Sequence, residues 1–157
     1  MALMLNRSDV QKLLPMSKAI DVVEAAFGEL AAGTAEMPDR TVMMDAAVGG
    51  WIAYMPAYLK SGGALGVKAV TVYKENPAKF GLPTTIGTIL VQDNKTGVVV
   101  AAMDGGLLTG VRTGASGGVA TRHLARKNSK VAGVLGTGVM ARSQVIALAE
   151  AASLETI

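Results

Sequence analysis

The chain has 157 residues, of which 50% are hydrophobic and 17% are charged, with a formal net charge of +3. This composition excludes an intrinsically disordered chain, and so small a charge gives no reason to expect a nucleic-acid partner. Cysteine is absent, which excludes disulfide bonds, thiolate catalysis and cysteine-ligated zinc, and we predict no metal site.

The N-terminus has no features of a targeting signal. The first residues, MALMLNRSD, contain no basic segment followed by an apolar stretch long enough for a secretory leader. No apolar run approaches the roughly 18 residues that a membrane-spanning helix needs. We therefore expect a soluble, cytoplasmic protein without a membrane partner.

Helix signals open the chain. Ser8 and Gln11 have the spacing of a capping box and predict a short helical turn that Pro15 limits. Ser17 can cap a second helix, and Gly33 is a suitable residue to end it. One face of this second helix is expected to be apolar, through Ile20, Val23, Phe27 and Leu30.

Strand signals follow. Apolar and β-branched segments, separated by turn residues, predict strands at residues 41–44, 51–58, 66–73, 84–92 and 98–103. Gly49 and Gly50 predict a hairpin turn, and the segments 76–77 and 81–83 have the composition of a loop. Strands that follow one another through short turns, with no helix between them, indicate an antiparallel sheet.

The C-terminal third returns to helix. Residues 107–126 have helical length, although a glycine in a helix costs about 1 kcal/mol relative to alanine. Another backbone or a ligand is therefore expected to come close to Gly110, Gly114, Gly117 and Gly118. Residues 130–135 (KVAGVL) predict a short buried strand, and residues 139–154 predict an alanine-rich helix.

A G-x-G-x-x-A sequence lies between this strand and this helix. Gly136 and Gly138 permit a tight turn that a pyrophosphate can approach, with Ala141 in the following helix. In the strand–helix context we favour dinucleotide binding, and an ordinary glycine turn is the alternative. Glu150 and Glu155 come too early to be the ribose-binding acid, so neither is assigned.

Three cations are candidates for binding an anionic ligand. Arg40 stands at the start of the predicted sheet, Lys68 lies in an apolar strand, and Arg112 lies near the start of the glycine-rich helix. From spacing alone, a solvated surface residue is the favoured interpretation for each, and anion binding is the alternative.

A basic cluster near the end of that helix is interpreted as a solvated helix terminus, where cations complement the helix dipole, rather than as a nucleic-acid patch. It comprises Arg122, His123, Arg126, Lys127 and Lys130.

Read in order, short motifs across nearly the whole chain resemble the ornithine cyclodeaminase/mu-crystallin family, which includes archaeal-type alanine dehydrogenase. The motifs are MPDR at 37–40, MPA at 55–57, GVK at 66–68, GLPT at 81–84, MDG at 103–105, LT at 108–109, RTGA at 112–115, LAR at 124–126 and GTG at 136–138. The resemblance implies an α+β N-terminal domain, with helices and an antiparallel half-barrel sheet, followed by the first βα unit of a Rossmann domain. We place the substrate-binding and dimerisation domain at residues 1–127 and the start of the NAD(P)-binding domain at 128–157.

The resemblance also implies functional roles for individual residues. Arg40, Lys68 and Arg112 match substrate-binding positions, and Lys68 is the expected catalytic residue because it can polarise or protonate near the α-amino or imino group. The positions expected to contact the cofactor are Thr84, Arg112, Gly136, Gly138, Val139 and Met140. The family often has glutamine where this chain has Met140, so a side-chain contact there would be lost while backbone contacts would remain.

The implied activity is NAD-dependent chemistry on a small amino-acid or imino-acid substrate, with NADP not excluded. The resemblance implies ornithine conversion to proline and ammonia, or oxidative deamination of the alanine dehydrogenase type, by a homodimer formed through the N-terminal sheet. In this family later chain completes the catalytic apparatus, so we expect the 157 residues to be incomplete as an enzyme. A non-catalytic, mu-crystallin-like binding protein and a truncated dimerisation module are the alternatives.

Overall fold

The computed structural model describes residues 1–157 and divides into two compact units. Residues 1–10 and 29–106 form the first unit, and residues 11–28 and 107–157 form the second. This grouping follows packing contacts within the chain. The division after residue 127 that the resemblance implies remains a prediction.

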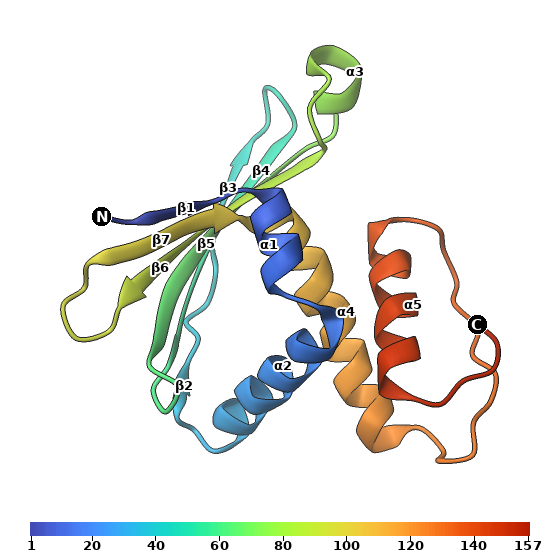
Figure 1. Ribbon diagram of the computed structural model, residues 1–157. Coiled ribbons are helices and arrows are strands. Elements are labelled where there is room, and N and C mark those ends of the chain that lie inside the picture. Colours follow the sequence, from blue (N-terminus) through green and yellow to red (C-terminus); the bar gives the residue numbers. More distant parts are fainter. The chain divides into compact units, whose positions relative to one another are not determined.

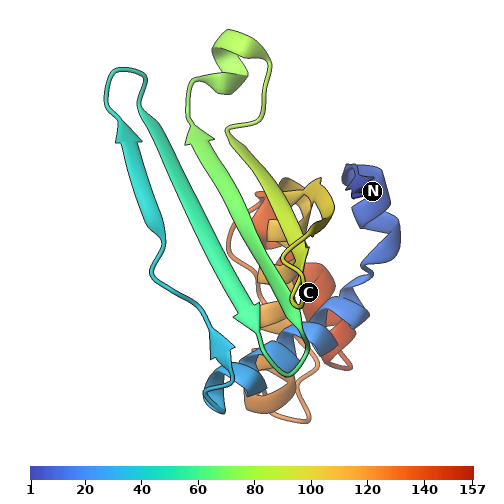
Figure 2. The ribbon, with the colours of Figure 1, turned by 90° about the vertical axis from the view of Figure 1, so that its left-hand side faces the viewer.

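The first unit is built on a mixed sheet of seven strands (Figure 1). The strands are β1 (Leu3–Leu5), β2 (Ala35–Glu36), β3 (Thr41–Asp45), β4 (Gly50–Leu59), β5 (Ala64–Tyr73), β6 (Thr85–Asp93) and β7 (Val99–Asp104). Their order is β1-β7-β6-β5-β4-β2, and β3 also pairs with β4. All pairings are antiparallel except that of β1 with β7. The predicted antiparallel sheet is therefore confirmed, and the long strands lie side by side in Figure 2.

Two short strands escaped the sequence analysis. Leu3–Leu5 pairs with β7 and Ala35–Glu36 pairs with the end of β4. Each has only two or three residues, too few for an alternating pattern to emerge from the sequence.

The segment between β5 and β6, expected to be a loop, contains the short helix α3 (Asn76–Phe80). Gly81 ends it in the left-handed conformation, at φ 64°, which glycine adopts without a steric penalty. Asn76 is buried, and its Nδ2 donates to the Pro83 carbonyl at 3.1 Å. The turn residues were recognised correctly, but their local hydrogen bonds close a helical turn.

The first two helices are α1 (Arg7–Leu13) and α2 (Met16–Ala31). The predicted cap of α1 was wrong by two residues, because Asn6 performs that function. Its Oδ1 accepts from the amides of Ser8 and Asp9, at 2.8 and 3.1 Å, and Asp9 Oδ2 accepts from the Asn6 amide at 3.0 Å. Gly33, at φ 71°, follows the end of α2 as predicted.

The second unit packs the first part of α2 against α4 (Gly105–Leu124) and α5 (Val139–Ala151). Its buried cluster comprises Met16, Ala19, Ile20, Ala115, Val119 and Ala147. The predicted helices at 107–126 and 139–154 are thus confirmed, with shifts of a few residues at their ends. No helix of the structure has the length and apolarity to cross a membrane.

Of the four glycines of α4 at which a backbone or a ligand was expected, Gly114 meets another backbone, and Gly110, Gly117 and Gly118 meet side chains. A Cβ on Gly114 would lie 2.5 Å from the Ser143 carbonyl oxygen of α5, and one on Gly118 would lie 2.7 Å from Ile20 Cδ1. The close neighbour of Gly114 is therefore the backbone of α5 and not a ligand. Gln144 adds a hydrogen bond from its Nε2 to the Thr113 carbonyl at 3.2 Å.

Residues 130–135 do not form the predicted strand. They make a single parallel bridge, between Val131 and Thr156, supported by the Ala132 amide donating to the Thr156 carbonyl at 3.0 Å. Val131 is 70% exposed, and Leu135 is fully exposed. The backbone of this segment bonds only to Glu155 and Thr156, through Lys130 and Ala132, which is too little pairing to form a strand.

Candidate functional site

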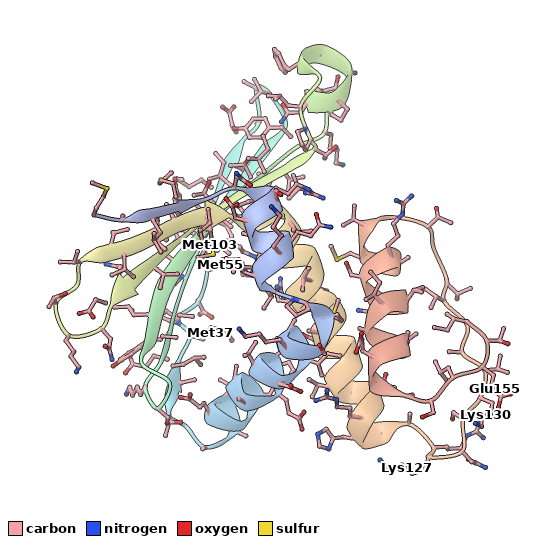
Figure 3. All side chains as sticks on the ribbon, viewed as in Figure 1. Met37, Met55, Met103, Lys127, Lys130 and Glu155 are labelled. Carbon is pink, nitrogen blue, oxygen red and sulfur yellow. The ribbon has the colours of Figure 1, made fainter.

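Lys68 lies in the middle of β5, the central long strand of the first unit. Its register partners are Met55 on β4 and Ile89 on β6, and Ile89 is in turn paired with Met103 on β7. Residues directly opposite in an antiparallel sheet share a face, so these four side chains form one row. Figure 3 labels Met55 and Met103 on this sheet.

The face that carries Lys68 is apolar around it. Two positions further along β5, Val70 is 7% exposed, and its partner Ala53 is fully buried. In the rows from Gly66 to Val72, no other charged residue lies on this face. Lys68 is half-buried and makes an interaction of its own within the protein. An ammonium group on an apolar surface is well placed to bind an anion whose remaining part is apolar.

Arg40 and Thr84 occupy the margins of the same sheet. Arg40 is exposed and directly precedes β3. Thr84 directly precedes β6, and its carbonyl accepts from the Tyr73 amide at 2.8 Å, so its backbone is fixed at the end of β5. Tyr73 is five positions from Lys68, and at about 3.3 Å per residue Thr84 lies on the order of 15 Å along the sheet from Lys68. The first unit therefore does not bring Thr84 next to Lys68.

Arg112 belongs to the second unit, on α4. Its side chain is exposed, and its carbonyl accepts from Ser116 Oγ at 3.0 Å, an ordinary contact within a helix. No carboxylate forms an ion pair with its guanidinium. Arg112 is thus available to an anionic group from solvent.

The glycine turn of the second unit leads directly into α5. Gly136 has φ 114°, which side-chain-bearing residues rarely adopt, and Gly138 is the N-cap residue without a side chain to satisfy the first amides of α5. A Cβ at Gly138 would meet no atom within 4 Å. Val139 and Met140 are 65% and 43% exposed.

This open helix start fits a phosphate group. The first amides of a helix carry partial positive charge and have no partner within the helix, so an anion can accept their hydrogen bonds. Beside the turn lies a hollow of about 460 Å³, lined by Val134, Gly136, Thr137, Ala141, Arg142, Val145, Ile146 and Ile157. Apolar walls with one arginine suit a ligand that combines an anion with an apolar body.

The basic cluster at the end of α4 is used in contacts within the second unit. Arg122 Nη1 contacts Asp21 Oδ1 at 2.7 Å and Glu24 Oε2 at 3.0 Å, and His123 Nε2 lies 2.6 Å from Glu24 Oε1. The hydrogen bonds from His123 and then from Arg122 lower the pKa of Glu24. The hydrogen bonds that Arg122 donates to Asp21 and then to Glu24 raise the pKa of Arg122.

The two lysines of the cluster, Lys127 and Lys130, also make contacts within the second unit. Lys127 Nζ donates to the Arg122 carbonyl at 3.0 Å, at the C-terminal end of α4, where a cation is favoured. Lys130 pairs with Glu155 at 3.2 Å, and Figure 3 shows the two beside each other. Lys127 thus lies at the helix terminus as interpreted, whereas the sequence analysis did not predict the ion pairs of Arg122, His123 and Lys130.

The sequence analysis assigned no role to Thr109, one helical turn before Arg112. Its hydroxyl oxygen is buried and has no hydrogen-bond partner. The available signals were its place in the LT motif at 108–109 and its spacing of three residues from Arg112, which places both on one side of a helix.

Known proteins are similar to this chain in sequence and in fold. Among curated relatives, an alanine dehydrogenase from Archaeoglobus fulgidus is 41% identical over 146 residues, which cover 93% of this chain and 44% of the relative. An L-lysine cyclodeaminase from Streptomyces rapamycinicus is 38% identical over 144 residues, which cover 90% of this chain and 42% of the relative.

The solved structures agree. Delta(1)-pyrroline-2-carboxylate reductase from Thermococcus litoralis, in complex with NADH and L-proline, matches with a TM-score of 0.90 and 48% identity over 97% of this chain and 47% of that chain. The chain thus spans less than half the length of these relatives. The sequence profile of the ornithine cyclodeaminase/mu-crystallin family matches residues 1–157, so the chain belongs to that family.

Proposed function

We propose that this chain provides the substrate-binding part and the start of the dinucleotide-binding part of an NAD(P)-dependent enzyme acting on small amino or imino acids. The observation that carries the proposal is the open glycine turn before α5, together with the parallel bridge that joins Val131, before the turn, to Thr156, after the helix. A strand position, a glycine turn, a helix and a second parallel strand position are the parts from which a Rossmann unit is built.

The proposed cofactor is NAD, with NADP as the variant form. The Thermococcus litoralis relative was solved with NADH, and a relative described as an archaeal alanine dehydrogenase dimer was solved with NAD. In this chain Gly136, Gly138, Val139 and Met140 are proposed to hold the pyrophosphate through backbone amides, with Thr84 and Arg112 as further contacts. When bound, the nicotinamide supplies hydride transfer, and the protein supplies orientation.

The proposed substrate-binding residues are Arg40, Lys68 and Arg112. A guanidinium binds a carboxylate through two parallel hydrogen bonds, which fixes the orientation of the α-carbon. Lys68, on its apolar face, is proposed to place a proton of its Nζ near the α-amino or imino group of the substrate. Relatives act on different substrates, since their names include an alanine dehydrogenase, a pyrroline-2-carboxylate reductase and an L-lysine cyclodeaminase. Alanine, cyclic imino acids and diamino acids are therefore the substrate panel.

The proposed assembly is a homodimer through the sheet. The face opposite Lys68 exposes large apolar side chains, including Met4 at 78%, Met43 at 46% and Tyr54 at 43%. Ile86 and Leu90 on β6 extend this surface. A broad apolar face on an antiparallel sheet is stabilised when a second sheet covers it. Sedimentation of the chain at micromolar concentration tests this, and a strictly monomeric chain contradicts it.

The test of function uses the native polypeptide that carries this sequence. Its intact mass is measured first against the 16.0 kDa of the 157 residues, to establish which chain is assayed. NAD is then added in a thermal unfolding experiment, where a concentration of 100 times the Kd stabilises the folded state by about 2.7 kcal/mol. Hydride transfer is followed as NADH absorbance across the substrate panel. Absence of both protection and turnover refutes the proposal.

Two alternatives give other results. A non-catalytic binding protein shows protection by NAD without hydride transfer on any member of the panel. A dimerisation module forms the dimer but shows no protection by NAD.

A further inference from the structure

The hydroxyl of Thr109 differs from every other hydroxyl on the two long helices of the second unit. The others donate to the carbonyl four residues earlier, from Thr113 to Thr109, from Ser116 to Arg112, from Thr121 to Gly117 and from Ser143 to Val139. These bonds are 2.6 to 3.1 Å long. Thr109 makes no such bond, yet its Oγ1 is buried.

This arrangement is unfavourable in the unliganded protein. A buried hydroxyl without a partner loses its hydrogen bonds to water and gains none in exchange. The bond to the carbonyl of Gly105, four residues earlier, is the contact that helical Ser and Thr side chains ordinarily make. The hydroxyl of Thr109 is therefore left without a partner among the protein's own donors and acceptors.

Thr109 and Arg112 occupy the same side of α4. At about 100° per residue, positions 109 and 112 are separated by roughly 60° around the helix and by about 4.5 Å along it. The side that packs against α5 is a different one, marked by the close contacts of Gly110 and Gly114. Ala115, in the buried cluster, marks the side that packs against α2.

We propose that Thr109 is a ligand-binding residue whose hydroxyl donates a hydrogen bond to the anionic oxygen group held by Arg112. The proposal rests on the function proposed above. A planar guanidinium and an O–H donor on the same helix side provide complementary donors for one oxyanion. The group is either the carboxylate of the amino or imino acid or a phosphate of the dinucleotide, because both present the same acceptor oxygens.

The experiment compares Thr109→Val with Thr109→Ser in the native polypeptide. Valine has the shape of threonine without its hydroxyl, whereas serine retains the hydroxyl. The affinity for NAD is measured by titration as a dissociation constant. The affinity for the amino or imino acid is measured as the KM or inhibition constant of L-alanine and L-proline. Ser116→Ala is the matched control, because Ser116 lies near the same side of α4 and its hydroxyl already has a partner.

We expect Thr109→Val to weaken one of the two ligands by about 10-fold or more, since a hydrogen bond to a charged group is lost. Thr109→Ser is expected to restore most of the affinity, and Ser116→Ala to leave both affinities unchanged. A weaker amino acid identifies the carboxylate as the partner, and a weaker NAD identifies the phosphate. The unliganded Thr109→Val protein is expected to unfold at the same or a higher temperature, because a buried unpaired hydroxyl has been removed.

Unchanged affinities for both ligands in Thr109→Val would overturn this inference while leaving the proposed function intact. A lower unfolding temperature with unchanged affinity would assign Thr109 a purely structural role. If the wild-type polypeptide binds neither ligand, the proposed function fails and this inference fails with it. Thr109→Ala, which adds no bulk, replaces the valine variant if that variant does not fold.

Discussion

The contact between α4 and α5 depends on the absence of a side chain at Gly114, and alanine at this position tests it. A Cβ on Gly114 would lie 2.5 Å from the carbonyl oxygen and 2.8 Å from the carbonyl carbon of Ser143. These are backbone atoms of α5, so no side-chain rotation can relieve the clash. The two helices must move apart, which disturbs the packing along the whole contact.

The magnitude follows from two opposing effects. Alanine in place of glycine favours the helix by about 1 kcal/mol. Overpacking costs about 1–3 kcal/mol, and we expect the upper part of this range because the contact is with backbone. Gly114→Ala is therefore expected to lower the free energy of unfolding by about 1–2 kcal/mol. At about 2–4 °C per kcal/mol, the unfolding temperature falls by roughly 2–8 °C.

Gly28→Ala is the matched control, because Gly28 lies within α2 and a Cβ there would meet nothing within 4 Å. It keeps the helix-propensity gain without the clash and is expected to stabilise by up to about 1 kcal/mol. Gly110→Ala is intermediate, since its nearest neighbours are the Ser143 and Val139 side chains at 3.3 and 3.4 Å. The assay is thermal or urea unfolding followed by circular dichroism. If Gly114→Ala is as stable as Gly28→Ala, the close approach of α4 and α5 is refuted.

Three further predictions concern single side chains. Because the hydrogen bond from His123, followed by that from Arg122, lowers the pKa of Glu24, its contribution to stability is present above the ordinary value of 4.5 and is lost as the pH falls through the lowered pKa. Glu24→Gln should therefore be less stable than wild type at pH 7, and equal unfolding-temperature differences at pH 7 and pH 3 would contradict this. Asn6→Ala is expected to cost about 1 kcal/mol by removing the cap of α1, measured by urea unfolding, with Asn6→Asp nearly neutral. Asn76→Ala is expected to cost about 1–3 kcal/mol because the Pro83 carbonyl loses its donor, and an unchanged urea midpoint would show that water replaces it.

The sequence was most informative where structure depends on neighbouring residues. Each predicted strand between residues 41 and 103 is present, because each carries its own alternation and is closed by its own turn. The glycine that ends α2 and the approximate length of α4 were also predicted correctly from neighbouring residues. The cap of α1 was missed because Ser8 and Asn6 are both good N-cap residues, and only the hydrogen bonds distinguish them.

The candidate residues were identified by type and motif, and the structure adds the surroundings that the sequence lacks. Lys68 was recognised as a cation in an apolar strand, but its row with Met55, Ile89 and Met103 depends on pairing between four strands. Thr109 was noted only as part of the LT motif and was given no role, because a threonine in a helix has an ordinary sequence signature. Its distinctive property is that its hydroxyl fails to make the bond that Thr113, Ser116 and Thr121 make.

Residues 130–135 show why composition alone does not produce a parallel strand. An antiparallel hairpin pairs with the segment that follows it, so the strands β4 and β5 can complete each other within some twenty residues. A parallel strand pairs only after a crossover, and the crossover helix α5 returns the chain to Val131 at Thr156. One bridge leaves Val131 and Leu135 exposed, whereas a sheet covered on both faces buries such residues. The apolar segment KVAGVL is therefore an extended segment held by one bridge, whereas α5, which follows it, packs Ala147 into the buried cluster of the second unit.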